Sequence, residues 1–493
     1  MSQTPTRPRV AVIGAGFGGI GAASVLRRAG FTDVTILERA ADVGGVWRDN
    51  TYPGAACDVP SSLYSFSFAP NPFWPRRYST QPDILAYLRR TAAAEGVLGQ
   101  VRFGTEVTGG AFDETEGVWR IETAAGETIT ADVLVPAVGQ LSRPALPQIP
   151  GAETFRGPAF HSADWDHDVD LAGKRVAVIG TGASAVQFVP RLQPGAKSVT
   201  VFQRSAPYVV PKPDRAYRPW HHRAYAALPA SQRVGRLATW GVGELLTAAL
   251  TSRRSLSRVV DLLFRLHLRR QVPDRTLRSR LVPDYAIGCK RLLFSNDWYP
   301  ALSAPNVDVV TDAITEITQA GVRTADGREH AVDVLVYGTG FTATDFLAPM
   351  RFRGLGGREL AAEWAGGARA HLGLTVPGFP NMFLVYGPNT NLGGNSIIAM
   401  MEGQFGYILD MVRKLSPGSC VDVREDVAAA FDAEMRDRLG RSVWAECSSW
   451  YRDQSGRITT NWPGLVREYR RRTARAELAD YQVVTAQRLT EGA

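Results

Sequence analysis

The sequence predicts an α/β fold of two Rossmann-like, three-layer units, with the second unit inserted into the first and carrying a helical excursion. Three observations lead to this prediction. A strand, a glycine-rich turn and a helix follow one another near the N-terminus, the same order recurs from residue 175, and two similar apolar strands enclose the recurrence. The chain has 493 residues, 45% of them hydrophobic, which is enough for two or three cores and excludes a disordered protein.

The first unit begins with the apolar strand 10–13, which leads through the turn G-A-G-F-G-G into a helix that extends to residue 28. The first glycine of such a turn permits a sharp bend, the second lets backbone amides approach a pyrophosphate, and the third allows the helix to pack closely on the strand. A second strand, 34–37, is followed by a glutamate whose carboxylate can accept hydrogen bonds from a ribose diol. We therefore expect a dinucleotide without a 2′-phosphate, such as FAD or NAD. The residues predicted to bind it are Gly14, Gly16, Gly19 and Glu38.

The second unit repeats this order, with a strand at 175–179, the turn G-T-G-A-S-A, a helix to about residue 192 and a strand at 198–202. Arg204 and Glu38 each lie 22 residues after the second glycine of their turn, so they occupy equivalent places. A guanidinium there matches a 2′-phosphate, which predicts NADPH in preference to NADH; a solvated arginine at a strand end is the alternative. The residues predicted to bind NADPH are Gly180, Thr181, Gly182, Ser184 and Arg204.

Two apolar segments, 131–139 and 332–340, have similar sequences and enclose the second unit. Strands of this kind return the chain to a Rossmann-like sheet, and a proline-rich joint follows the first of them. We therefore expect a discontinuous first domain with the second domain inserted in it. The predicted boundaries are 1–145 and 330–493 for the first domain, 150–328 for the second, and about 211–283 for a helical insert in the second.

The net charge of +8 arises locally, because 14 arginines and only three acidic residues lie between Arg215 and Arg280, a local charge of +11. The favoured interpretation is a solvated helical face, and a lipid-facing or partner-facing role stays open. Nucleic-acid binding is not expected, because the segment lacks interleaved aromatic residues and a known module.

The four cysteines are Cys57, Cys289, Cys420 and Cys447, and they show no paired spacing. We expect neither a disulfide framework nor a cysteine-ligated zinc site, and a reducing compartment. The first nine residues lack the apolar core of a signal peptide, and glycines and prolines interrupt the longest uncharged stretch, 370–401. The sequence thus predicts a cytoplasmic protein without an integral membrane segment.

The segment from Gly44 to Asp58, GGVWRDNTYPGAACD, combines glycines and a proline with large aromatic residues. Glycine and proline fix unusual backbone geometry, and Trp47 and Tyr52 offer flat apolar surface for a ring system. An isoalloxazine ring fits that surface better than a second adenine does. We therefore expect flavin packing here, with ordinary loop anchoring as the alternative, and include Tyr64 among the flavin contacts.

The segment 155–166, FRGPAFHSADWD, can be explained from its residues alone as a loop packed on a domain face. Its pattern, FxGxxxHxxxW followed by Pro or Asp, resembles the fingerprint of the type I Baeyer-Villiger monooxygenases, a branch of the flavin-containing monooxygenase superfamily. The segment 44–58 is similar to that family's companion pattern, GGxWxxxxYPGxxxD, and the resemblance covers nearly the whole chain. Trp165 followed by Asp166 favours this branch over relatives that usually carry another aromatic residue there.

The resemblance extends to the segment around Lys290 and Arg291, which the residues alone would describe as a surface pair. It implies that Lys290 contacts the 2′-phosphate of NADPH, that Arg291 is catalytic beside the flavin, and that Asp58 is the acidic partner of Arg291. Because buried opposite charges must be paired, contact between Asp58 and Arg291 is also a physical requirement. Trp450 resembles a family tryptophan that closes on bound NADP.

The family places the fingerprint in the linker between the domains, away from the reacting atoms. The resemblance therefore implies a hinge and cofactor-supporting role for its histidine rather than a role as general base. The other six histidines are scattered, and no metal site is expected. The fingerprint residues are Phe155, Gly157, His161 and Trp165.

The resemblance implies an NADPH-dependent flavoprotein monooxygenase. NADPH would reduce FAD, the reduced flavin would react with O2, and the resulting flavin peroxide would attack a ketone and give an ester or lactone. A charged guanidinium nearby would keep the peroxide deprotonated. Oxygenation of sulfur or nitrogen is the main alternative. A flavin disulfide reductase, disfavoured by the single Cys57 in the flavin segment, and a non-catalytic nucleotide-binding protein are the others. The sequence leaves the particular ketone and the oligomeric state open.

Overall fold

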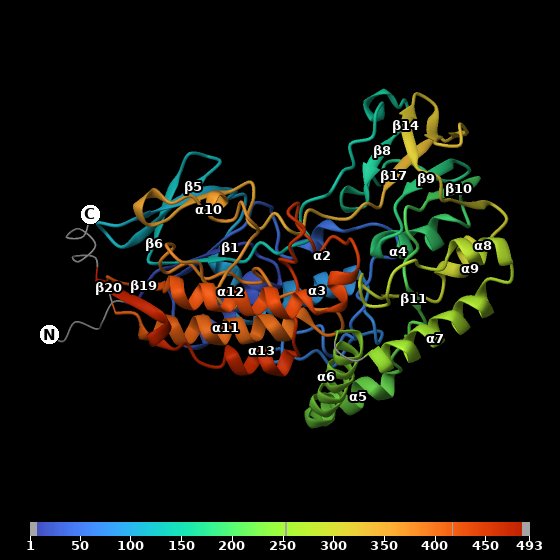
Figure 1. Cartoon of the computed structure of the whole chain (residues 1–493). Coiled ribbons are helices and arrows are strands. Elements are labelled where there is room, and N and C mark those ends of the chain that lie inside the picture. The colour runs from blue at the N-terminus through green and yellow to red at the C-terminus, as the bar shows by residue number, and fades with distance from the viewer. Residues whose placement is uncertain (1–6, 252–253, 417, 486–493) are drawn as a thin grey trace.

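A computed structural model describes residues 7–251, 254–416 and 418–485. Two α/β domains lie side by side, and a group of helices in the middle of the chain extends along one edge of the molecule (Figure 1). The predicted α/β fold with two Rossmann-like domains is confirmed. None of the helices in the described ranges has the length and apolar character needed to cross a lipid bilayer.

The first domain is built on a parallel sheet. In spatial order its strands are β3 (Val101–Arg102), β2 (Val34–Leu37), β1 (Val10–Ile13) and β7 (Val133–Pro136). Val10 pairs with Val34 on one side and with Val133 on the other. Because side chains alternate along a strand, Val10 and Val12 enter one core, and Ala11 and Ile13 enter another.

Two different layers cover this sheet. Three helices share the core with Val10 and Val12: α1 (Phe17–Arg28), α3 (Gln81–Ala94) and α11 (Ile397–Lys414). A second sheet covers the opposite face, and its strands in order are β18 (Arg351–Arg353), β4 (Val107–Asp113), β5 (Val118–Thr123) and β6 (Thr128–Ala131). The first domain also contains the helices α2 (Val46–Asp49), α10 (Leu360–Glu363), α12 (Glu425–Gly440) and α13 (Val466–Arg472), and the antiparallel pair β19 (Ser419–Val423) and β20 (Tyr481–Thr485).

The second domain repeats this plan. Its parallel sheet contains, in spatial order, β13 (Val307–Val310), β10 (Ser198–Phe202), β9 (Arg175–Ile179), β17 (Val334–Tyr337) and β8 (Ala159–His161). Val176 and Val178 face a core shared with α4 (Ala183–Leu192) and α9 (Trp298–Leu302). Ala177 and Ile179 face the antiparallel sheet of β14 (Ile314–Thr318), β15 (Gly321–Thr324) and β16 (Glu329–Ala331).

The strands β7 and β17 come from the two similar segments, and each pairs with the strand that precedes the glycine turn of its own domain, β7 with β1 and β17 with β9. An aspartate precedes each strand and pairs with an arginine at the start of the neighbouring strand: Asp132 with Arg9 at 2.8 Å, and Asp333 with Arg175 at 2.7 Å. Because β17 pairs with β9 and β8, the second domain continues to Tyr337. The predicted boundary at 328–330 is therefore wrong; it falls before β17, an inner strand of the second domain's sheet.

The predicted helical excursion contains α5 (Pro219–Ala227), α6 (Pro229–Thr251), α7 (Arg254–Gln271) and α8 (Arg275–Arg280), and a short parallel pair, β11 (Val209–Val210) and β12 (Leu293–Phe294), closes its base. Phe264 and Leu268 of α7 are buried in the core of the second domain. Arg236 of α6 instead reaches the first domain, where its guanidinium donates hydrogen bonds of 2.8 Å to the carbonyl oxygens of Ser62 and Ser65. The excursion thus bridges the two domains.

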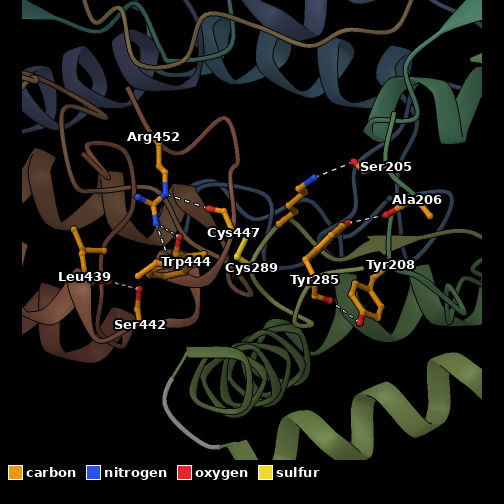
Figure 2. Close-up of a disulfide and its surroundings, with 12 residues drawn as sticks. Ser205, Ala206, Tyr208, Tyr285, Cys289, Leu439, Ser442, Trp444, Cys447 and Arg452 are labelled. Carbon is orange, nitrogen blue, oxygen red and sulfur yellow. Dashed lines mark hydrogen bonds between the residues drawn. A yellow bond between two sulfur atoms is a disulfide. The ribbon is translucent and has the colours of Figure 1, made fainter. Parts of the chain in front are cut away.

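Cys289 and Cys447 form a disulfide with a Cα–Cα distance of 6.1 Å (Figure 2). The expectation that the cysteines do not pair is therefore wrong. The two residues are 158 positions apart and meet only because the loop before Lys290 reaches the segment after α12. Figure 2 shows hydrogen bonds on both sides of the disulfide, including one of 3.1 Å from Arg452 to the carbonyl oxygen of Cys447.

Candidate active site

A cavity of about 720 Å3 lies between the two domains and extends to α6. The first glycine turn, the segment 44–58, the start of α4 and the loop that carries Arg291 all contribute to its wall. The predicted site residues that line it are Gly14, Gly16, Glu38, Trp47, Asp58, Tyr64, Ser184 and Arg291.

The first glycine turn has the geometry that the sequence predicts. Gly14 has a positive φ of +98°, and a Cβ there would lie 2.9 Å from the carbonyl oxygen of Ala137. A Cβ on Gly19 would overlap the carbonyl oxygen of Gly14, so this glycine is needed for the close packing of α1 on β1. Gly16 opens on the cavity at the N-terminus of α1, where a pyrophosphate would meet the positive end of the helix dipole.

Glu38 lies at the end of β2 with its carboxylate buried at the edge of the cavity. The carboxylate accepts hydrogen bonds from the backbone amides of Ala15, at 2.8 Å, and Ala40, at 3.0 Å. Arg48 adds an ion pair of 3.1 Å, a contact that the sequence analysis missed. These partners hold the carboxylate in place at the cavity wall, where a ribose could bind.

The aromatic residues of the flavin segment lie together in the cavity wall. The Trp47 indole donates a hydrogen bond of 3.1 Å to the Tyr64 hydroxyl, and their ring centroids are 5.5 Å apart. Burial raises the pKa of Tyr64 far above its ordinary value, so its hydroxyl stays neutral. Tyr52 takes a different role, because its hydroxyl donates to Gln187 of α4 at 3.0 Å and so links the two domains. Gln187 has no signal in the sequence that would have identified it.

Asp58 and Arg291 meet in the cavity wall, as the resemblance implied. Arg291 Nη2 lies 3.3 Å from Asp58 Oδ2, and Lys212 Nζ lies 3.9 Å from Asp58 Oδ1. Asp58 is nearly buried, whereas the Arg291 side chain is 42% exposed and faces the cavity. Desolvation is the largest single influence on Arg291 and would lower its pKa, but Asp58 and, to a smaller extent, Tyr451, Cys57 and Tyr386 together outweigh it and raise the pKa above its ordinary value. The arginine therefore stays charged at any working pH. Lys212 is a further residue that the sequence analysis missed.

The second glycine turn repeats the geometry of the first. Gly180 has a φ of +106°, and a Cβ there would lie 2.5 Å from the carbonyl oxygen of Gly338, which follows β17. The Thr181 hydroxyl donates to the carbonyl oxygen of Ser205 at 3.0 Å and ties the turn to the end of β10. Gly182 is the N-cap of α4, and Ser184 lines the cavity.

A cluster of positive charge lies at the end of β10. Lys290 Nζ donates a hydrogen bond of 2.9 Å to the Ser205 hydroxyl and lies 4.4 Å from the centre of the Tyr285 ring. Burial lowers the pKa of Lys290, and repulsion from the nearby Arg204 lowers it further. Two cations that influence each other at one strand end fit a dianionic phosphate.

The fingerprint residues lie in the second domain, on β8 and on the segments beside it, and none of the four lines the cavity. A Cβ on Gly157 would overlap the carbonyl oxygen of Asp333, so this position admits only glycine. The His161 ring is buried, and its centroid lies 5.7 Å from that of the Phe341 ring. Its Nδ1 accepts a hydrogen bond of 3.1 Å from the Ala163 amide, and burial lowers the pKa of the imidazole. Trp165 packs against Phe188 of α4 at 5.3 Å, whereas Phe155 belongs to the opposite core.

Trp450 stands apart from the other predicted residues. It lies at the surface, with its ring 4.3 Å from that of Tyr451, and is not among the described residues that line the cavity. Its segment is held to the Arg291 loop by the disulfide three residues earlier.

The site can be tested for its fit to a flavin and a nicotinamide dinucleotide from the donors and acceptors that it presents. Asp58 Oδ1 is buried and accepts no hydrogen bond from the described residues, and Gln140 Oε1, also in the cavity wall, has no partner there either. Glu38, Gly16 and the Trp47–Tyr64 pair supply what a ribose, a pyrophosphate and a flat ring require. The residues present thus fit both dinucleotides.

Several known proteins resemble this chain in sequence and in fold. Residues 11–239 match the family described as pyridine nucleotide-disulphide oxidoreductase. A Baeyer-Villiger monooxygenase of Streptomyces coelicolor is 48% identical over 98% of this chain and 94% of its own length. A Baeyer-Villiger monooxygenase of Pseudomonas aeruginosa is 41% identical, with the same coverage of both chains. Among solved structures, an oxidized steroid monooxygenase bound to NADP has a TM-score of 0.86 and 31% identity and covers 97% of this chain and 100% of its own. Cyclohexanone monooxygenase in its closed form has a TM-score of 0.87 and 28% identity, covering 98% and 100%.

Proposed function

Because the chain belongs to the Baeyer-Villiger monooxygenase family, we propose that it uses FAD and NADPH to insert one oxygen atom of O2 beside a ketone carbonyl, giving an ester or lactone. The other oxygen atom leaves as water, with its electrons supplied by NADPH. The observation that carries this proposal is the Arg291 guanidinium, which projects into the cavity between the domains and is held by Asp58 at 3.3 Å.

The proposed roles of the protein follow from charge and position. When bound, FAD supplies the activation of O2 and NADPH supplies the hydride that reduces the flavin. Arg291 provides a fixed positive charge where negative charge develops on oxygen during attack on the carbonyl. Asp58 orients the guanidinium, and Lys212 on the far side of Asp58 balances the carboxylate. The apolar wall around them limits the access of water.

The proposed binding sites divide between the two domains. Gly14, Gly16 and Glu38 hold the FAD pyrophosphate and ribose, and the Trp47–Tyr64 pair supports the ring system. Lys290 and Arg204 select NADPH over NADH through the 2′-phosphate. His161 and the fingerprint act as the hinge between the domains.

A flavin disulfide reductase would need a reactive cysteine pair beside the flavin. The cavity wall, in the part of the chain that the structure describes, contains Cys57 but neither cysteine of the disulfide. Burial raises the pKa of Cys57 to about 12, so its thiolate is not available near neutral pH. The reductase alternative is thus disfavoured by position and by chemistry.

The test is to purify the protein with FAD and to measure NADPH oxidation and product mass with a panel of ketones and thioethers. We expect one oxygen atom to be added to at least one ketone, to give an ester or lactone, with a strong preference for NADPH over NADH. Oxygenation of thioethers alone, or NADPH oxidation that yields only hydrogen peroxide with every ketone, would contradict the proposal.

A further inference from the structure

The helices α6 and α7 each expose a row of apolar side chains. The exposed residues of α7 are spaced i, i+3, i+4 and i+7, and those of α6 recur at a similar helical spacing, so each helix presents one apolar face outward. Every one of these side chains is more than half exposed. We call this surface the apolar stripe; it consists of Val234, Leu237, Val242, Leu245, Val259, Leu262, Leu263 and Leu266.

The opposite faces of both helices are already used. On α7, Phe264 and Leu268 are buried in the second domain. On α6, the Glu244 carboxylate accepts hydrogen bonds from the Asn395 side chain at 2.9 Å and from the Val466 amide at 3.0 Å, and Arg236 bonds to the first domain. Because these other faces are held by the two domains, the stripe faces outward. A helix face in contact with water is normally polar. Figure 1 shows both helices along one outer edge of the molecule.

Arginines accompany the stripe. On α7, the exposed residues Arg258, Arg265 and Arg269 lie along one border of the apolar face, and the exposed Arg270 continues its axis at the C-terminal end. The whole segment from Arg215 to Arg280 carries a charge of +11. Leucine on one face and arginine at its border is the pattern of helices that lie in the interface of an anionic bilayer.

The stripe is also continuous with the active-site cavity. Val242 is 66% exposed and at the same time lines the cavity, together with Thr239 and Leu246 from the same helix. The cavity thus reaches the surface at the stripe, and its wall also contains Arg291. An apolar molecule that left a bilayer at this point would meet the cavity at Val242 and Leu246.

We propose that α6 and α7 dock this protein on the surface of an anionic lipid bilayer, with the apolar stripe in the headgroup–acyl boundary and the arginines on the lipid phosphates. If the proposed function holds, lipophilic ketones dissolved in the bilayer are the substrates that reach the cavity this way. A second copy of this chain is a poorer occupant, because two segments of charge +11 would then face each other.

The test is flotation of the FAD-loaded protein with vesicles of phosphatidylglycerol and phosphatidylcholine, and with vesicles of phosphatidylcholine alone. We expect flotation with the anionic vesicles, weaker binding to the neutral vesicles, and release from the anionic vesicles as salt is raised. The double variant Leu262→Asp/Leu266→Asp should bind at least about tenfold more weakly, because it removes two apolar side chains from the interface. The variant Arg269→Gln/Arg270→Gln should lose affinity for the anionic vesicles only.

The control is Val483→Asp, which places one aspartate at an exposed apolar position on β20, away from the stripe, and should leave flotation unchanged; the single variant Leu262→Asp matches it in charge and should weaken flotation. Circular dichroism and bound FAD establish that each variant is folded. Failure of the wild type to float, equal binding by the Leu262/Leu266 variant, or a dimer that dissociates in that variant would each overturn the proposal. Flotation requires no turnover, so loss of ketone oxidation with intact flotation would count against the proposed function alone.

Discussion

The ion pair between Asp58 and Arg291 leads to a quantitative prediction for the variant Asp58→Asn. This substitution keeps the size of the side chain and removes its charge. Coulomb attraction at the observed 3.3 Å is about 5 kcal/mol at an effective dielectric constant of 20. The Arg291 side chain is 42% exposed, so solvent screens part of that energy. We take about 2–3 kcal/mol as the energy that orients Arg291, which corresponds to a 30- to 160-fold loss in the rate of ester formation.

The assay separates chemistry from reduction of the cofactor. Ester formation and NADPH oxidation are measured side by side at saturating NADPH, together with hydrogen peroxide. In Asp58→Asn, NADPH oxidation should continue while its electrons appear in hydrogen peroxide instead of ester. Arg291→Ala, which removes the guanidinium itself, should show the same uncoupling with a larger loss, about 100- to 1000-fold. Asp132→Asn is the matched control, because Asp132 forms an ion pair of 2.8 Å with Arg9 and does not line the cavity.

The control should retain the wild-type ratio of ester to NADPH consumed. If Asp58→Asn also retains that ratio, the carboxylate does not position Arg291 during oxygen insertion. An equal fall in Asp132→Asn would show that loss of any ion pair disturbs turnover, and the argument from position would fail in that case too.

Three further predictions concern other parts of the molecule. Lys290→Ala should raise the KM for NADPH about tenfold or more while leaving that for NADH nearly unchanged, because a charge-assisted contact to the 2′-phosphate is lost; equal changes for both cofactors in steady-state kinetics would refute this role. Cys447→Ser should lower the free energy of unfolding by up to about 5 kcal/mol, since the disulfide closes a loop of 158 residues, and an unchanged melting curve would contradict this. Burial raises the pKa of Asp422 to about 6. Ionisation of its carboxyl group in the folded protein therefore lowers the free energy of unfolding as pH rises from about 4 to 6, and the loss stays constant above pH 6. Asp422→Asn should therefore become more stable relative to wild type over that range, by at most about 3 kcal/mol, in denaturant titrations at several pH values. A difference that does not change with pH would exclude the assigned pKa.

Local sequence patterns correctly predicted the features of the fold that depend only on residues close together in the chain. The glycine turns, the strands that flank them and the place of Glu38 at a strand end are all set within about 30 residues of chain. Arg291 and Asp58, in contrast, lie in different domains. From its residues alone the arginine would be interpreted as a surface residue, and only the family resemblance implied that it is catalytic.

Contacts between distant segments could not be predicted in this way. Lys212 and Gln187 carry no local signal, because one is a lysine after a β-strand and the other a polar residue within an amphipathic helix. The Cys289–Cys447 disulfide depends on how the C-terminal segment packs against the inserted domain. The boundary at 330 was misplaced because β7 and β17 have nearly the same sequence, and only strand pairing shows that each belongs to a different sheet.

The disulfide also limits how the two domains can move. The chain crosses between them twice, and the crossings lie together, because the Ala145 amide donates to the Gly340 carbonyl at 2.9 Å and the Thr342 amide donates to the Arg143 carbonyl at 3.0 Å. Two adjacent crossings leave the inserted domain free to rotate about a single axis that passes through them. The disulfide is a third covalent connection between the domains, at a different place. The inserted domain can therefore rotate only as far as the loops beside Cys289 and Cys447 can extend.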